Sequence, residues 1–360
     1  MLDTGRSEYA ISVVIPVRDG AHVIGRCLQA LAETDAAGQE YEVIVVDNGS
    51  KDDTPAVVKA FAGRMNLRML SVPGVPVSAV RNAGAAHARG VLLAFVDADC
   101  VVRKNWMRFA LTYPWDQRSG AIGSFWTAAS DATWVARVWC GFENPRRRGT
   151  VELLPAGNVV MPRRAFEAAN GFDETLESNE DAEFCWRLRT MGLRVEAESG
   201  LEAVHLGARQ TIRALYRREV WHGREVLAVF LRSGANARAV AFAFYTLFWS
   251  VAFVAAVGRW LWMGDVRFMA LALAALIMAP TAIAMRSVLR RHEWRDLGPL
   301  VLLLAVYGVG RAVALISGLE RAWQRHTRRG DTRSGGARSG RGKREPAKQY
   351  MGLRGDSRSE

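Results

Sequence analysis

The sequence predicts an α/β fold: a mostly parallel sheet with helices on both faces, followed by hydrophobic helices of a membrane region. Up to about Gly207, short runs rich in Val and Ile alternate with stretches of helical spacing. This alternation is typical of strand–helix–strand units joined by right-handed crossovers, which build parallel sheets. From about Arg238, charges disappear over segments long enough to cross a bilayer core of about 30 Å.

Four strands are expected in the first part of the chain. Each is short and apolar on both faces, as a sheet covered on both sides requires. In such a sheet, ligands bind beyond the carboxyl ends of the strands. The expected strands span residues 11–17, 42–47, 67–72 and 91–97, and helical stretches over 21–34, 53–63 and 77–90 separate them.

Composition narrows the classes of protein. The net charge is +12, and the Arg-rich tail over 330–360 has few apolar residues. It favours disorder, with electrostatic attachment to anionic lipid or nucleic acid as the functional alternative. The four cysteines form no CxxC pair, which argues against a zinc site or a disulfide framework. The chain contains no GxxxxGK[ST] loop, and no GxGxxG follows the first strand, so P-loop and dinucleotide-binding domains are disfavoured.

Two segments are expected to cross a membrane as helices. Residues 239–257 carry no charge, and residues 268–285 are a second apolar run. Two such segments in succession rarely fit the core of one small soluble domain. The basic loop over 286–296 should be cytoplasmic, which puts the α/β domain on the same side after two crossings.

A third apolar segment, 297–319, contains Arg311. An Arg near the bilayer centre costs about 2.5–3.5 kcal/mol on insertion scales. A third crossing would also place the Arg-rich tail outside, against the positive-inside tendency. We therefore expect a shallow or re-entrant third segment and a cytoplasmic tail.

Acidic residues follow the expected strands. Asp47 follows the second strand, where a capping role and a ligand contact are equally compatible with it, and Asp53 suits a helix cap. Asp97 and Asp99 follow the fourth strand, and two ionised carboxylates this close require a counter-charge. A divalent cation such as Mg²⁺ or Mn²⁺ can supply that charge, because hard cations prefer carboxylate oxygens.

A second pair of acids, Glu180 and Asp181, begins an expected helix. Acids in a first helical turn also suit the helix dipole, so this pair alone does not indicate a site.

Taken together, these residues resemble the family 2 glycosyltransferases of the A-type fold, in particular membrane-anchored bacterial-type members. The motifs that carry the resemblance occur in the family's order between Ile11 and His205, over half of the chain. They are SVVIPVRDG, EVIVVDNGSKDDT, AVRNAGAAHARG, LLAFVDADC, AGNVVMPRRAFEAANGFDE and NEDAEFCWRL.

The resemblance implies a nucleotide-sugar site. Asp47 matches the position that contacts the base or ribose, and Pro16 and Arg18 match the wall of the nucleotide pocket. Arg81 and Asn82 match the family's RN near the nucleotide.

It also implies a metal site and a base. Asp97 and Asp99 match the DxD motif, with Asp99 the more direct ligand of a cation that bridges the diphosphate. Asp181 matches the general base of an inverting displacement, and Glu180 would support it or touch the acceptor. His205 matches a histidine that helps to bind the metal in some members, although a structural role is equally compatible with a lone histidine.

The implied activity is transfer of a sugar from a nucleotide-diphosphate sugar, most commonly a UDP-sugar, to a hydroxyl acceptor. QTIRA, at 210–214, lacks the Trp of the processive Q-x-x-R-W motif, which favours transfer of a single sugar. A lipid-linked saccharide for cell-surface polysaccharide is one acceptor class, used at the cytoplasmic face of the inner membrane by a multi-pass protein. Membrane lipid is an expected partner, and nucleic acid is not.

The expected organisation has four parts: a catalytic domain over 1–207, a basic juxtamembrane helical region over 208–237, a membrane region of two or three helices over 238–319, and a basic, disordered tail over 320–360. Two other functions remain as alternatives to glycosyl transfer. One is a nucleotidyltransferase of related fold, although VIPVRDGAHV lacks the Gly-rich basic loop that such enzymes often carry. The other is a non-catalytic membrane scaffold.

Overall fold

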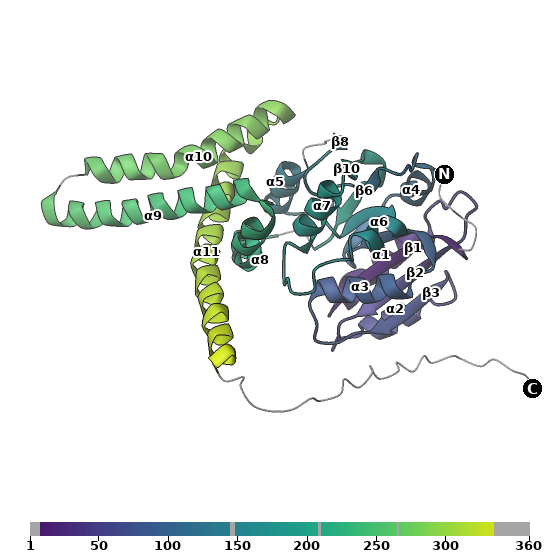
Figure 1. The fold of residues 1–360 in the computed structure, drawn as a ribbon. Helices are drawn as coiled ribbons and strands as arrows, with labels where there is room; N and C mark the ends of the chain where they lie inside the picture. Colours follow the sequence, from purple (N-terminus) through teal and green to yellow (C-terminus); the bar gives the residue numbers. More distant parts are fainter. Residues whose placement is uncertain (1–7, 145–147, 208–209, 265, 335–360) are drawn as a thin grey trace, which may run out of the picture. The chain divides into compact units, whose positions relative to one another are not determined.

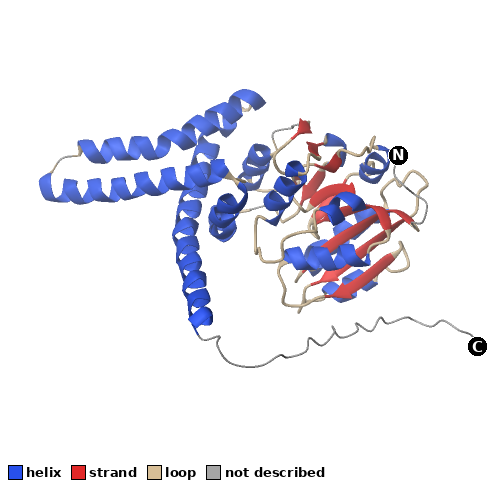
Figure 2. Cartoon of the chain, viewed as in Figure 1, coloured by secondary structure: helices blue, strands red, loops and turns tan. Residues whose placement is uncertain are grey.

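The computed structural model describes residues 8–144, 148–207, 210–264 and 266–334 (Figures 1 and 2). The α/β fold and the apolar helices belong to one compact unit, Met1–Leu319, and Glu320–Glu360 is a separate unit. Most of the expected tail lies outside the described residues, but the last helix continues into it as far as Ser334.

An eight-stranded sheet forms the centre of the α/β fold, in the order β3-β2-β1-β4-β9-β6-β10-β8. The first four strands in this order are parallel, and β9 runs antiparallel between β4 and β6. The mostly parallel sheet and its four expected strands are thus confirmed. The strands are β1 (Tyr9–Val17), β2 (Tyr41–Asp47), β3 (Leu67–Ser71), β4 (Gly90–Val96), β6 (Ser119–Gly123), β8 (Gly149–Thr150), β9 (Asn158–Pro162) and β10 (Arg194–Ala197).

Helices cover both faces of this sheet, which explains why its strands lack a polar face. On one face, Ile15 of β1 packs in a layer with Leu28 of the first helix. On the other, Phe95 of β4 packs in a layer with Phe184. The covering helices are α1 (Ala21–Ala32), α2 (Thr54–Lys59), α3 (Val77–His87), α4 (Trp106–Thr112), α6 (Arg163–Ala168) and α7 (Glu180–Thr190). Another helix, α5 (Trp134–Glu143), packs instead beside the small second sheet and on later helices.

A small second sheet lies beside the carboxyl end of β4. It consists of β5 (Cys100–Val102), β11 (Ala203–His205) and β7 (Trp126–Ala128), with β11 in the middle. The register pairs His205 with Cys100, so a residue late in the domain is placed directly beside Asp99. The parallel strands align their ends as well, because Val17 pairs with Asp47.

The two expected crossing segments are long helices, α9 (Ala237–Met263) and α10 (Arg267–Arg291). They lie side by side in Figure 1, and the Tyr245 hydroxyl of α9 donates to the Ala275 carbonyl of α10. Both are long and apolar enough to cross a membrane, and only about a fifth of their apolar windows (22% and 17%) is buried. Their exposed apolar surfaces suggest association with lipid.

The third apolar segment is a continuous helix, α11 (Leu297–Ser334), preceded by a short 3-10 turn, η2 (Trp294–Asp296). Its apolar part is also long enough to cross a membrane, but 44% of that window is buried. Its Leu303 and Leu304 pack in one cluster with Val138 of α5 and Leu215 of α8 (Ile212–Ser233). A re-entrant segment does not describe this helix, because its hydrogen-bonded structure has no break.

Arg311 has an acidic partner, so its charge is no longer an argument against a continuous apolar helix here. Its guanidinium pairs with the Glu219 carboxylate of α8 at 2.9 Å and lies over the Tyr307 ring at 5.0 Å. Small residues let the two helices approach closely: Gly223 of α8 lies against Ala314 and has no room for a Cβ. α11 is thus attached to α8 along the stretch in which sequence reasoning saw an interruption.

Candidate active site

The acids of the DxD motif lie where β4 leaves the large sheet. The Asp97 amide donates to the Gly157 carbonyl at 3.0 Å, and the Cys100 amide donates to the Asp97 carbonyl at 2.9 Å. These bonds hold the turn between β4 and β5. Gly157 lies directly against the Asp97 carboxylate, and any Cβ at Gly157 would overlap it. The sequence AGN therefore needs its glycine for the carboxylate to be seated.

Arg81 joins the two groups of acids. This buried side chain on α3 donates to Asp97 at 2.8 Å and to Glu180 at 2.7 Å. It thus supplies part of the counter-charge that sequence reasoning assigned to a cation. Its place is between the two acid motifs, and the role near the nucleotide that the resemblance implies stays a prediction.

Asp99 and His205 bring together ligand atoms that could hold a cation. His205 Nε2 lies 3.7 Å from an Asp99 oxygen, too far for a hydrogen bond and close enough for both atoms to reach one ion. Together with the Cys100 sulfur, their ligand atoms all lie within 4.8 Å of one another. Asp97 is not part of this group, because Arg81 holds its carboxylate.

The donor set fits Mg²⁺ or Mn²⁺ in part. A carboxylate suits both ions, whereas an imidazole ligand favours Mn²⁺ over Mg²⁺. The pKa of the Asp99 carboxyl is raised, mainly because the group is buried and also because the charge of Asp97 is near. Burial also raises the pKa of the Cys100 thiol well above its usual value, which keeps it protonated and makes it a poor ligand.

Sequence reasoning assigned Arg218 of α8 to lipid headgroups, to a phosphate-linked acceptor or to a solvated basic helix, and not to a metal site. Its charge lowers the pKa of both Asp99 and His205, so it lies near the cation position. It also donates to His222 at 3.2 Å, one turn further along α8. The only signal in the sequence was the basic character of the segment LYRREVWHGREV.

Asp181 is half-buried in the first turn of α7. The pKa of its carboxyl is raised to about 7, by burial first and then by the neighbouring Glu180 charge, while a hydrogen bond from the Ala182 amide opposes both. A carboxyl with a pKa near neutrality is suited to accept a proton. Just before α7, Asn179 has a left-handed backbone (φ 62°) and donates to the His222 carbonyl at 2.7 Å. α8 is therefore tied to the start of α7.

Asp47 closes the turn after β2. Its carboxylate accepts from the Ser50 amide at 3.2 Å and from the Ser50 hydroxyl. Its predicted contact with the base or ribose stays a prediction. The cap expected of Asp53 is absent, because that side chain accepts no capping bond. Asp52 does so instead, accepting from the Thr54 amide at 3.1 Å.

The remaining predicted nucleotide contacts differ in exposure. Arg18 is exposed just beyond β1, and Pro16 is buried within the strand. Asn82 donates to the Phe172 carbonyl and to Glu174, and it accepts from the Phe172 amide, each at 2.9 Å. Its polar atoms thus fasten a loop after α6, and its predicted role at the nucleotide stays a prediction.

This sheet, with acids gathered at the carboxyl ends of its parallel strands, defines an A-type nucleotide-sugar transferase fold. Residues 12–167 match the family described as glycosyl transferase family 2. This stretch, less than half of the chain, is therefore similar to a family 2 glycosyltransferase domain.

Relatives and solved structures agree with this class. The chain is 28% identical over 251 residues to the pre-mycofactocin glycosyltransferase of Mycobacterium tuberculosis, covering 64% of this chain and 49% of that protein. It is 28% identical over 234 residues to the validoxylamine A glucosyltransferase of Streptomyces hygroscopicus, covering 54% and 56%. The chain thus spans about half the length of these curated relatives.

A mannosyltransferase of Pyrobaculum calidifontis, solved in complex with GDP-Man and Mn²⁺, shares the fold, with a TM-score of 0.58, 18% identity and 88% coverage of both chains.

Proposed function

We propose that this protein transfers one sugar from a nucleotide-diphosphate sugar to a hydroxyl acceptor, with inversion and with the help of a divalent cation. The observation that carries the proposal is the bridge that Arg81 makes between Asp97 and Glu180. It places the DxD acids beside the acids that begin α7, as a reaction between a donor and an acceptor requires. The glycosyltransferase names of the relatives support the same class.

Asp99 and His205 would hold the cation, whose charge would offset the charge that develops on the leaving diphosphate. The proposal assigns the chain's own residues three tasks. Arg81 keeps Asp97 and Glu180 in place, and Arg218 adds positive charge near the diphosphate position. Asp181 accepts the acceptor's proton.

The bond changes balance in a single displacement. The acceptor oxygen forms a bond to the anomeric carbon as the bond from that carbon to the diphosphate oxygen breaks. Asp181 takes the hydroxyl proton, and the nucleoside diphosphate leaves with the bonding electrons. Attack from the face opposite the leaving group inverts the anomeric configuration.

Product analysis tests the reaction class. Purified protein with Mn²⁺, a nucleotide sugar and acceptor should release the nucleoside diphosphate. Release of pyrophosphate from a sugar phosphate and a nucleoside triphosphate would instead indicate a nucleotidyltransferase. Failure to bind any nucleotide in the presence of Mn²⁺ would favour the scaffold.

The donor is proposed to be a UDP-sugar, the most common donor class of the family that the motifs resemble. The Pyrobaculum neighbour was solved with GDP-Man, so a GDP-sugar is the first alternative to measure. A thermal-shift screen of nucleoside diphosphates with and without Mn²⁺ separates the two, and the sugar series then follows for the best binder. A lipid-linked saccharide is the proposed acceptor class.

We further propose that α9 and α10 cross the inner membrane while the catalytic domain, residues 1–207, stays in the cytoplasm. The region over 208–237 then lies at the membrane surface, next to a membrane region over 238–319.

In this proposal α11 lies along the cytoplasmic surface of the membrane. One side of it packs on α5 and α8, which precede the apolar helices α9 and α10 in the chain. Its strongly exposed apolar residues form one stripe at helical spacing, suited to contact lipid. They are Leu302, Val309, Val313 and Ile316.

A further inference from the structure

A cavity of about 770 Å³ lies between α5 and the turn that joins α10 to α11. It is outside the candidate active site, and three arginines, Arg137, Arg291 and Arg295, contribute to its wall. Trp134 and Trp294 line it as well, and 39% and 55% of their respective surfaces are exposed. Exposed tryptophans beside arginines are typical of the headgroup level of a membrane.

The charges of the cavity are not balanced. Arg291 pairs with Glu293 at 2.6 Å and with Asp296 at 3.5 Å, which uses both acids of the wall. Within the described residues, neither Arg137 nor Arg295 forms an ion pair, and both are exposed. The site therefore keeps excess positive charge available for an anion.

Arg291 also fixes the shape of the wall. Its guanidinium lies directly on Gly141 of α5, where any Cβ would overlap it. The end of α10 is thus seated on the α/β domain, so the arginines of α5 and of the turn face one cavity. α11 begins at Leu297 beside it, and the N-terminus of this long helix adds partial positive charge.

We propose that this cavity binds the phosphate of an anionic phospholipid headgroup and thereby fastens the catalytic domain to the membrane. The proposal rests on the membrane placement of α9 and α10 given above, and it does not depend on the glycosyl transfer. Two guanidinium groups can donate several hydrogen bonds to phosphate oxygens, and the two tryptophans suit the boundary between headgroups and acyl chains. A basic pocket beside the cytoplasmic ends of membrane helices has the chemistry that recognises such headgroups.

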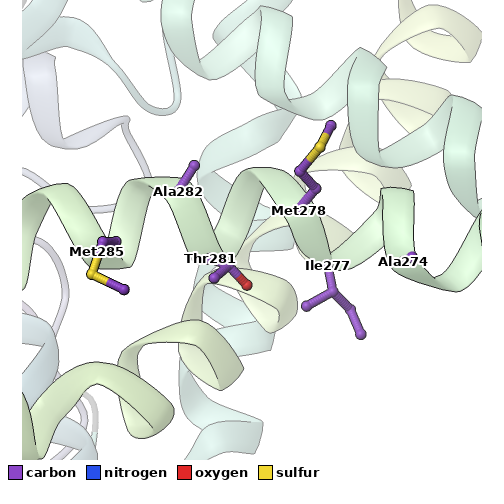
Figure 3. Close-up of a pocket in the computed structure, with 6 residues that line it drawn as sticks. All are labelled: Ala274, Ile277, Met278, Thr281, Ala282 and Met285. Atoms are coloured by element: carbon purple, nitrogen blue, oxygen red, sulfur yellow. The ribbon is translucent and has the colours of Figure 1, made fainter.

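A second hollow, on α10 itself, differs from this cavity because its lining carries no charged side chain. Figure 3 shows its lining side chains, among them Ile277, Met278 and Met285, projecting from a single helix. Thr281 supplies the only side-chain oxygen of that lining. It offers no charge to a phosphate, and its surface suits acyl chains in general.

The test uses the full chain in nanodiscs of phosphatidylcholine, with or without phosphatidylglycerol. We expect phosphatidylglycerol to raise the melting temperature, because a ligand that binds only the folded state stabilises it. The double variant Arg137→Gln/Arg295→Gln should lose most of this rise, with binding weakened roughly fivefold per arginine. Native mass spectrometry should show fewer retained phosphatidylglycerol molecules on this variant.

The matched control is Arg238→Gln/Arg290→Gln, which removes the same charge from exposed positions of α9 and α10 that do not line the cavity. This control variant should keep the rise in melting temperature that phosphatidylglycerol causes. Equal loss in both double variants would reduce the effect to general surface attraction and overturn the proposal. A rise of the same size from inorganic phosphate in phosphatidylcholine nanodiscs would overturn the lipid as its source. Neither measurement depends on transfer activity. Lipid binding at this cavity can therefore be tested even if the protein transfers no sugar.

Discussion

At the scale of the residue, Arg81 determines how the two pairs of acids coexist. Its side chain is 5% exposed and holds carboxylates from the turn after β4 and from α7 at hydrogen-bond distance. Glu180 is itself buried, and Arg81 is the cation that faces it. Removing the guanidinium would leave a buried carboxylate without its cation.

We expect Arg81→Gln to lower the free energy of unfolding by about 3–5 kcal/mol, the usual cost of breaking a buried pair from one side. Arg81→Lys should cost less, because an ammonium keeps the charge but cannot donate to both carboxylates in the same planar geometry. Denaturant unfolding in detergent measures both. Equal stability of Arg81→Gln and the native chain would show that the bridge contributes nothing.

Asp181 gives a pH-dependent prediction with a defined sign. The folded carboxyl has a pKa of about 7, whereas an Asp in an unfolded chain titrates near pH 4. The folded state therefore pays a penalty that grows from about pH 4 to about pH 7 and is constant above. Asp181→Asn should remove it, so the variant should melt higher than the native chain at pH 8, with a smaller difference at pH 5. A difference that grows as the pH falls would contradict the raised pKa.

The cation site predicts different outcomes for two neighbouring residues. Asp99→Ala should weaken Mn²⁺-dependent donor binding, because it removes the proposed carboxylate ligand. Cys100→Ala is the matched control and should keep the Mn²⁺ dependence, because the buried thiol stays protonated. Isothermal titration of donor with and without Mn²⁺ compares them. Unchanged Mn²⁺ dependence in Asp99→Ala would refute the assignment.

The acids at this scale were visible in the sequence, but their partners were not. A strand followed by Asp97 and Asp99 can be seen in eleven residues, whereas Arg81 meets Glu180 across 99 positions of the chain. Only the packing of α3 and α7 on the same face of the sheet brings these two together. Asp52 and Asp53 show a second limit of prediction from sequence. Either of two neighbouring acids can cap a helix, and the backbone of the turn before α2 determines that Asp52 accepts the bond.

At the scale of the element, the pairing of α8 with α11 explains a charge inside an apolar segment. Glu219 is 1% exposed, and Arg311 reaches it from α11 at 2.9 Å. The apolar pattern predicted a hydrophobic helix correctly and could not reveal that α8 packs along it.

We expect Arg311→Met to destabilise the protein by about 3–5 kcal/mol, because Glu219 then loses its buried partner. The double variant Glu219→Gln/Arg311→Met should recover part of that loss, since no buried charge is left alone. Melting of the four proteins of this cycle in one detergent gives the coupling. Simple addition of the two single effects would contradict a direct pairing.

At the scale of the whole molecule, the arrangement joins an α/β domain to an apolar hairpin through α8 and α11. The domain class and the first two apolar helices could be predicted because they rest on local periodicity and length. The attachment of α11 to the α/β domain could not, because it depends on contacts between distant segments.

The proposed placement of α11 along the membrane surface predicts that the tail stays in the cytoplasm. A single cysteine introduced near position 345, with the four native cysteines buried, should resist membrane-impermeant reagents in intact cells and react after permeabilisation. Labelling of intact cells would show that α11 crosses the membrane.

The central claim is that Asp181 is the base of a sugar transfer whose donor is held elsewhere in the site. The most direct measurement compares the native chain and Asp181→Asn, with Mn²⁺ and the identified donor and acceptor, for donor affinity and for release of nucleoside diphosphate. We predict equal donor affinity within about twofold and a loss of transfer of at least about a hundredfold, the usual range for removal of a general base. Near-normal turnover by Asp181→Asn would contradict the account.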